Sequence, residues 1–138
     1  MNLTQKEIDF LDDFKAQEKL CIEKYDRYSA CACSTELKSL FGELADRERG
    51  HLKTINEMSG TVADVPPTVK ANNCNCGCAG YCDENSRKND SFLCSDMLAS
   101  EKHASGLYDT GIFEFTDPKA RKMLNHIQAD EQQHGEQI

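Results

Sequence analysis

Two copies of a Glu-x-x-His motif are the side chains of this sequence best placed to do chemistry. The six residues concerned are Glu18, Glu48, His51, Glu101, Glu131 and His134. In a helix, residues three positions apart lie on one face, one turn from each other, so a glutamate and a histidine at this spacing can reach the same metal ion. One such motif arises easily by chance. Two motifs, each preceded by another glutamate 30 positions upstream, are much rarer.

Four amphipathic segments would position these side chains as helices. Apolar residues recur at three-to-four spacing over residues of about 4–33, 35–59, 90–115 and 118–138. The capping box from Thr4 to Glu7 starts the first helix, and Ser34 with Thr35 starts the second. Gly60 ends the second, and Asp117 before Pro118 begins the fourth. Short connections make neighbouring helices antiparallel, so each pair forms a hairpin.

The two halves of the sequence repeat with an offset of 83 positions. AQEKLCIEKYDRYS at 16–29 aligns with ASEKHASGLYDTGI at 99–112, and the same offset carries Glu48 onto Glu131 and His51 onto His134. Between the halves, residues of about 60–89 lack an apolar period and are rich in cysteine. We therefore predict an all-α, antiparallel four-helix bundle of ferritin-like connectivity. It would form one domain over 1–138, with hairpins at about 4–59 and 90–138 joined by a long crossover loop.

All six candidate residues interrupt apolar stripes, so the predicted packing places them inside the bundle. Burying an unpaired carboxylate costs several kcal/mol, and the stripes contain no Lys or Arg to offset that cost. Two divalent cations would neutralise four carboxylates, and the simplest interpretation is a pair of bound metal ions. The alternative is a duplicated bundle whose cluster is purely structural and has lost its metal. His103 and His126 match no repeat position, and we expect them at the surface.

This order of motifs across four helices resembles ferritin-like di-iron carboxylate proteins of the bacterioferritin and rubrerythrin type, and also manganese catalases. The resemblance implies two iron ions, with manganese or zinc as alternatives. It further implies that Glu18 and His51 hold one ion, that Glu101 and His134 hold the other, and that Glu48 and Glu131 bridge them. Tyr25 and Tyr108 look like the family's tyrosines beside the ligands, although ordinary core packing would explain them equally well.

The sequence also departs from that family. Rubrerythrins carry a further carboxylate one turn from the helix 3 ligand, where this chain has Leu98 and Ala104, and a domain with two Cys-x-x-Cys pairs that is missing here. The second half, from DMLASEKHASGLYDTG onward, is also similar to clostridial spore-coat proteins of the coat F type. That similarity implies a location more than a reaction.

A second group of side chains that could bind metal is the cysteine cluster. Its members are Cys31, Cys33, Cys74, Cys76, Cys78, Cys82 and Cys94. The alternating spacing suits soft, thiolate-bound metals but is not a zinc-ribbon spacing. The topology would bring Cys82 and Cys94 towards Cys31 and Cys33. Disulfides that staple an irregular loop, a second metal site and a redox relay all remain open.

Composition narrows the function further. The net charge is −8 without a basic block, which argues against nucleic acid as a partner. Neither a secretion signal nor a membrane-spanning apolar run is evident, so we expect a soluble cytoplasmic protein, with the spore coat as the alternative. Two functions follow: an oxidoreductase of ferroxidase, peroxidase or catalase type that reacts with O₂ or hydrogen peroxide, or a structural assembly protein. A homodimer is compatible with either.

Overall fold

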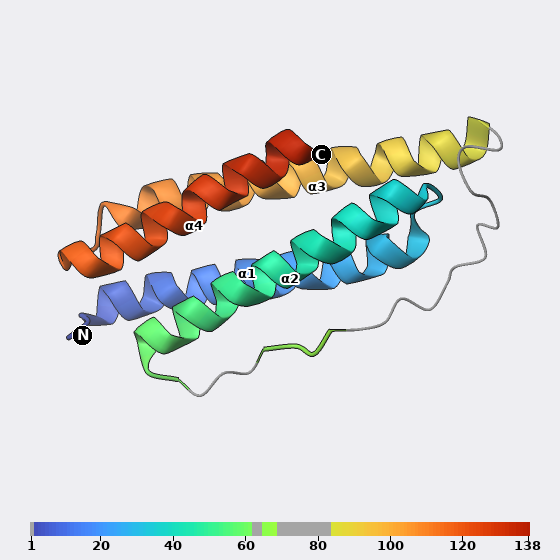
Figure 1. The fold of residues 1–138 in the computed structure, drawn as a ribbon. Helices are drawn as coiled ribbons and strands as arrows, with labels where there is room; N and C mark the ends of the chain where they lie inside the picture. Colours follow the sequence, from blue (N-terminus) through green and yellow to red (C-terminus); the bar gives the residue numbers. More distant parts are fainter. Residues whose placement is uncertain (1, 62–64, 69–83) are drawn as a thin grey trace.

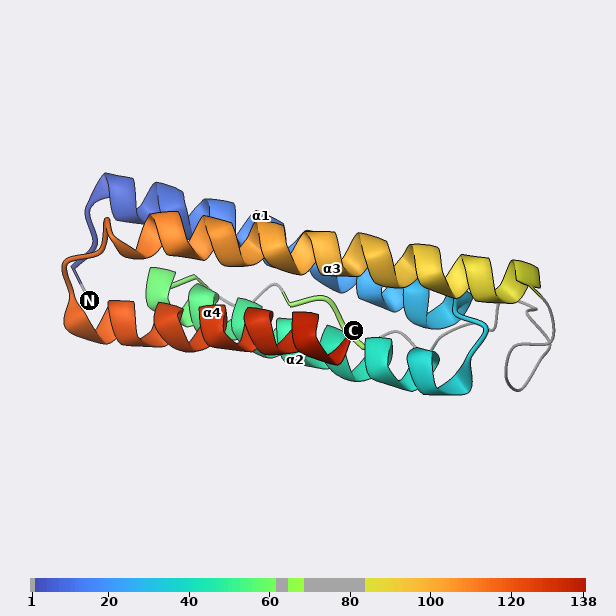
Figure 2. The same cartoon turned by 90° about the horizontal axis from the view of Figure 1, so that it is seen from above.

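Four helices form an elongated bundle in the computed structural model, which describes residues 2–61, 65–68 and 84–138 (Figure 1). They are α1 (Gln5–Cys31), α2 (Thr35–Ser59), α3 (Glu84–Ile112) and α4 (Pro118–Gln137). Helices α1 and α2 form one antiparallel hairpin, and α3 and α4 form the other. Helix α1 lies along α3 and α2 along α4, with the second contact sparser (Figure 2). The predicted all-α four-helix bundle is therefore confirmed. Within the described ranges, each helix lacks an apolar stretch that could span a bilayer.

The helix ends follow the predicted capping residues. Thr4 and Glu7 form a reciprocal capping box, with each side chain accepting the other residue's backbone N–H. The Ser34 hydroxyl and the Asp117 carboxylate accept backbone N–H groups at the starts of α2 and α4. Gly60 ends α2 in the left-handed conformation, with φ of 71°. Local sequence thus determines most of the helix boundaries.

The start of α3 differs from the prediction, which placed it near Asp90. The helix begins six residues earlier, at Glu84, and the predicted crossover is correspondingly shorter. Residues 84–89 are polar and mostly exposed, so no apolar period marks this part of the helix. Asp90 is fully helical, and its carboxylate instead accepts the backbone N–H groups of Cys33 at 2.8 Å and Ser34 at 2.9 Å. Asp90 therefore lies within α3 and binds the turn between α1 and α2.

The buried core consists of two apolar clusters, one on each side of the candidate residues. The first contains Leu11, Phe14, Ile55, Met58, Tyr108, Ile112, Phe115, Ala120, Leu124 and Ile127. The second contains Cys21, Tyr25, Ala32, Phe41, Leu44, Ala45, Leu93 and Met97. Along α1, α2 and α3 the candidate residues fall between the two sets, and on α4 they lie between the first set and Ile138, which packs against the second. They therefore form a polar layer across the middle of the bundle, enclosed by apolar packing at both ends.

Helix α3 passes close to Phe14 of α1 at Gly111. A Cβ atom added at Gly111 would overlap the end of the Phe14 ring and stand 2.9 Å from its Cε1 atom. The ring cannot easily move, because it is fully buried and stacks on Tyr108 with 4.4 Å between ring centroids. Glycine is thus required at this position by the helix–helix distance and not by its backbone angles.

We expect Gly111→Ala to destabilise the protein by about 1–3 kcal/mol, because the added methyl group overpacks the α1–α3 contact. The matched control is Gly106→Ala in the same helix, where a Cβ meets nothing within 4 Å. That change should be neutral or stabilising by up to about 1 kcal/mol through helix propensity. Urea unfolding of both variants measures the difference. Equal stability of the two would contradict the close packing.

Candidate metal centre

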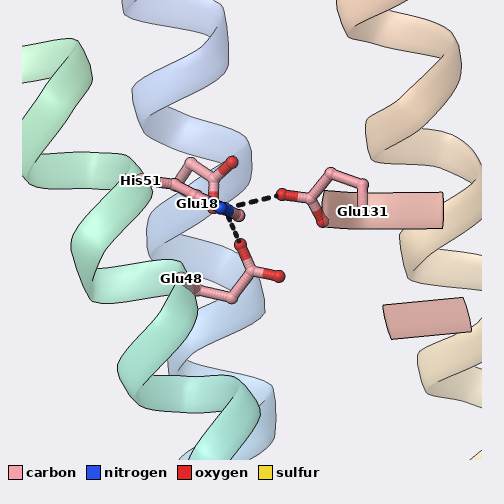
Figure 3. A group of neighbouring side chains, drawn as sticks. All are labelled: Glu18, Glu48, His51 and Glu131. Atoms are coloured by element: carbon pink, nitrogen blue, oxygen red, sulfur yellow. Dashed lines mark hydrogen bonds and ion pairs between the residues drawn. The ribbon is translucent and has the colours of Figure 1, made fainter. Parts of the chain in front are cut away.

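Six side chains from all four helices converge in the polar layer. All are buried, with exposed fractions between 0 and 6%. Their potential ligand atoms form two groups in which every atom lies within 4.8 Å of the others: Glu18, Glu48, His51 and Glu131 (Figure 3), and Glu48, Glu101, Glu131 and His134. Glu48 and Glu131 belong to both groups. Glu18 and His51 thus fall in one group and Glu101 and His134 in the other, while two glutamates are common to both.

Each histidine turns its Nδ1 atom towards the carboxylates. His51 Nδ1 lies 3.0 Å from Glu48 Oε2 and 3.0 Å from Glu131 Oε1, the two contacts drawn in Figure 3. His134 Nδ1 lies 3.0 Å from Glu48 Oε1 and 3.4 Å from Glu101 Oε1. The Glu48 carboxylate thus contacts both imidazoles, one with each oxygen. Because a neutral imidazole nitrogen is also a metal ligand, both rings are oriented to share an ion with these carboxylates.

Two tyrosines connect the site across the two hairpins. The Tyr25 hydroxyl of α1 donates to Glu101 of α3, and the Tyr108 hydroxyl of α3 donates to Glu18 of α1. Burial raises the pKa of both tyrosines, and the negative charge of the bonded glutamate raises it further. Both hydroxyls therefore stay protonated and remain donors. The two tyrosines thus both bond to the candidate residues and pack in the apolar clusters, Tyr108 in the first and Tyr25 in the second.

Several buried carboxylate oxygens have no hydrogen-bond partner among the described residues. Within the cluster they are Oε2 of Glu18, of Glu101 and of Glu131. Oε2 of Glu18 and of Glu131 have only a histidine Nδ1 at 3.9 Å. Buried polar atoms are normally hydrogen-bonded, so three such oxygens in one layer favour a bound cation. Arg49 is buried nearby on α2, but it pairs with Asp26 and Asp46 outside the layer. A donor set of carboxylate oxygens and imidazole nitrogens fits iron, manganese or zinc.

Protons compensate for part of the buried charge when no cation is bound. Burial, reinforced by the negative charge of Glu48, raises the pKa of Glu18 well above its ordinary value. Burial and the charge of Glu18 do the same for Glu131. Burial alone would raise the pKa of Glu101. Its hydrogen bonds, of which the one with His134 has the largest effect, outweigh burial and lower the pKa. Burial lowers the pKa of His134, but its hydrogen bonds to Glu101 and Glu48 raise it on balance to about 9. Metal binding would have to displace these protons.

One residue that contacts the site, Asp130, was not predicted from the sequence. Asp130 of α4 places its Oδ2 atom 2.9 Å from His51 Nε2, on the side of the ring that faces away from the cluster. A carboxylate in this position fixes the orientation of an imidazole and makes it a better ligand. The 83-residue offset aligns Asp130 with Arg47, so the repeat could not identify it. The sequence feature that could have pointed to Asp130 is its position four residues, about one helical turn, before His134.

Cys21 is a second residue beside the site that sequence reasoning did not select. It lies one turn after Glu18 on α1, and its sulfur accepts a hydrogen bond from the Gln17 amide at 3.4 Å. Burial, and then the negative charges of Glu48 and Glu18, raise the pKa of its thiol. The side chain is therefore a neutral thiol and adds no charge to the layer.

The predicted cysteine cluster is described only in part. Cys31 and Cys94 pack against the same apolar cluster, and the Asn89 amide bonds the Cys31 carbonyl at 3.0 Å and the Cys33 sulfur at 3.8 Å. Cys31, Cys33 and Cys94 are thus at the same end of the bundle, as the topology predicts. Cys74, Cys76, Cys78 and Cys82 lie outside the described residues. Among the described cysteines, none belongs to a group of three or more candidate ligands.

We expect the metal-free protein to lose thermal stability as the pH rises from about 6.5 to about 9. The pKa of His134 is about 9 in the folded state against 6.5 ordinarily, so its protonation stabilises the fold below pH 6.5, and this is lost as the pH passes 9. The raised pKa values of Glu18 and Glu131 act in the same direction. Melting temperatures in the presence of a chelator measure the slope, and His134→Gln should flatten it. Stability that increases over this range would contradict the charge balance.

Comparison with known families identifies one related domain. Residues 89–138 match the Coat F domain. The matched segment contains most of α3 and all of α4, including Glu101, Glu131 and His134. No curated protein and no solved structure matches the chain. The second hairpin is therefore similar to the Coat F domain, in agreement with the similarity of the second half to spore-coat proteins of the coat F type.

Proposed function

We propose that this chain is a metal-binding component of the spore coat, in which the four-helix bundle holds two divalent ions. The observation that carries the proposal is the buried layer of four carboxylates and two imidazoles, in which three carboxylate oxygens have no hydrogen bond. Glu18 with His51 and Glu101 with His134 would each hold one ion, and Glu48 and Glu131 would contact both. Iron is the expected metal, with manganese or zinc as alternatives.

The structural part of this proposal follows from the charge in the layer. Without a cation, the fold retains its buried carboxylates only by holding protons. With two ions bound, the same side chains become attractive partners that link all four helices, so the free energy of metal binding adds to the free energy of folding. The similarity of residues 89–138 to the Coat F domain favours the spore coat as the place where such a stable bundle is used.

A second candidate function is a di-iron oxidoreductase that reacts with O₂ or hydrogen peroxide. A bound pair of redox-active ions would supply the electrons for such a reaction. The observation that favours it is the position of Tyr25 and Tyr108, whose buried hydroxyls donate to Glu101 and Glu18. These hydroxyls hold a proton at each terminal carboxylate, and the enclosing apolar clusters keep bulk water out.

The first test is the metal content of protein purified without added metal. We expect close to two ions per chain, and loss of both in His51→Ala/His134→Ala, because each group then lacks its only imidazole. His103→Ala is the matched control: it removes an exposed histidine from α3 and should retain the full content. A wild-type protein that stays metal-free after incubation with Fe²⁺, Mn²⁺ and Zn²⁺ would rule out the proposal.

Glu131→Gln separates a bound metal from a purely structural cluster. Without metal, the variant should be more stable than wild type at about pH 8, because Gln mimics the protonated carboxyl that burial already favours. With metal, the order should reverse, because one shared ligand is lost. Calorimetric melting with and without chelator gives both comparisons. A variant that is equally stable or more stable in both states would favour a cluster that has lost its metal.

If the protein is an oxidoreductase, it must reduce peroxide or O₂ in repeated catalytic turnovers. Iron-loaded protein supplied with an external reductant should consume peroxide or O₂ far beyond its own iron content, as followed with an oxygen or peroxide electrode. Consumption that stops once the bound iron is oxidised would leave the metal with a structural role only.

A further inference from the structure

A cavity between α2 and α4 borders the candidate metal centre. Its volume is about 560 Å³, and its lining includes Gly50, His51, His126 and Asp130. It lies where the two hairpins touch sparsely, along the α2–α4 side of the bundle seen in Figure 2. The space beside His134 is much smaller, about 80 Å³. The wider approach to the buried layer is therefore on the His51 side.

A line of three ligand-type side chains runs through this cavity from the interior to the surface. His51 Nε2 lies 2.9 Å from Asp130 Oδ2, and the same oxygen lies 3.7 Å from His126 Nε2. The exposed side-chain fractions rise along the line, from 8% for His51 to 23% for Asp130 and 78% for His126. His126 and Asp130 are four residues apart on α4, so they face the same way.

The other charged residues of the cavity do not decide what it binds. Asp46, Arg47 and Lys122 also line it, and together with Asp130 they amount to two acidic and two basic groups. The cavity as a whole is therefore close to neutral. Any preference for a cation has to come from the paired imidazole and carboxylate of His126 and Asp130, which are the same donor types as in the inner layer.

We infer that His126 and Asp130 form an outer divalent-cation site from which the inner pair is loaded. The inference rests on the proposed function, because it assumes that the inner layer binds metal. Two protein ligands hold an ion weakly and leave its remaining positions to water, as suits a site that releases its ion inward. Gly50 keeps the approach open, since a Cβ atom at this position would meet nothing within 4 Å.

The test uses Co²⁺ as the probe and metal-free full-length protein. Equilibrium dialysis counts the bound ions, and stopped-flow absorption gives the rate at which the inner ligands take up Co²⁺. We expect His126→Ala to keep the inner pair at equilibrium but to load it roughly tenfold or more slowly, because the local ion concentration at the cavity mouth falls. His103→Ala, which removes an exposed histidine elsewhere, should load at the wild-type rate.

Gly50→Leu tests the route without touching a ligand. Leucine is the better helix former, so the metal-free variant should be at least as stable as wild type, while its side chain projects into the cavity beside His51 and slows loading. Wild-type loading rates in both His126→Ala and Gly50→Leu would overturn the inference and leave the proposed function intact. If wild-type protein takes up no Co²⁺ into the inner layer, the proposed function fails first, and the inference fails with it.

Discussion

The charge of four carboxylates buried in one layer is the constraint on which the rest of this structure depends. Glu18, Glu48, Glu101 and Glu131 are all nearly inaccessible to solvent, yet the buried Arg49 next to Glu48 pairs with Asp26 instead. The fold can tolerate this layer only with protons or cations in it. The raised pKa values of Glu18 and Glu131, and the pKa of about 9 for His134, mean that bound protons offset part of this charge when no cation is present. Two divalent ions would offset the same charge and would also contact the carboxylate oxygens that lack a hydrogen bond.

Neither hairpin can build the site alone. The group around His51 takes Glu131 from the second hairpin, and the group around His134 takes Glu48 from the first. The tyrosine contacts cross in the same way, each hydroxyl reaching a glutamate of the opposite hairpin. The segment similar to the Coat F domain therefore supplies only part of each group, and the first hairpin completes both. Duplication of one helical hairpin explains why the two groups have the same composition.

Helix existence and the positions of the six residues could be predicted because they depend on local signals. Apolar stripes, capping residues and the 83-residue repeat can each be recognised directly in the sequence. The start of α3 could not be predicted, because its first turns are polar and Asp90 resembles an N-cap while it binds a distant turn. Asp130 was missed because the repeat places Arg47 at its equivalent position, and because its role depends on the distance between α2 and α4. The ligand roles of the six residues remain a prediction.

The contact of Asp90 has a consequence for how the chain reaches this structure. Two backbone N–H groups in the turn between α1 and α2 donate to the Asp90 carboxylate, which lies 57 and 56 positions further along the chain. The two backbone N–H groups of this turn therefore find their partner only when α3 packs against the first hairpin. Closing a chain segment of that length has an entropic cost that only the docked second hairpin repays. Formation of the bundle should accordingly be an all-or-none event that involves both halves, and not the sequential assembly of two independently folded hairpins.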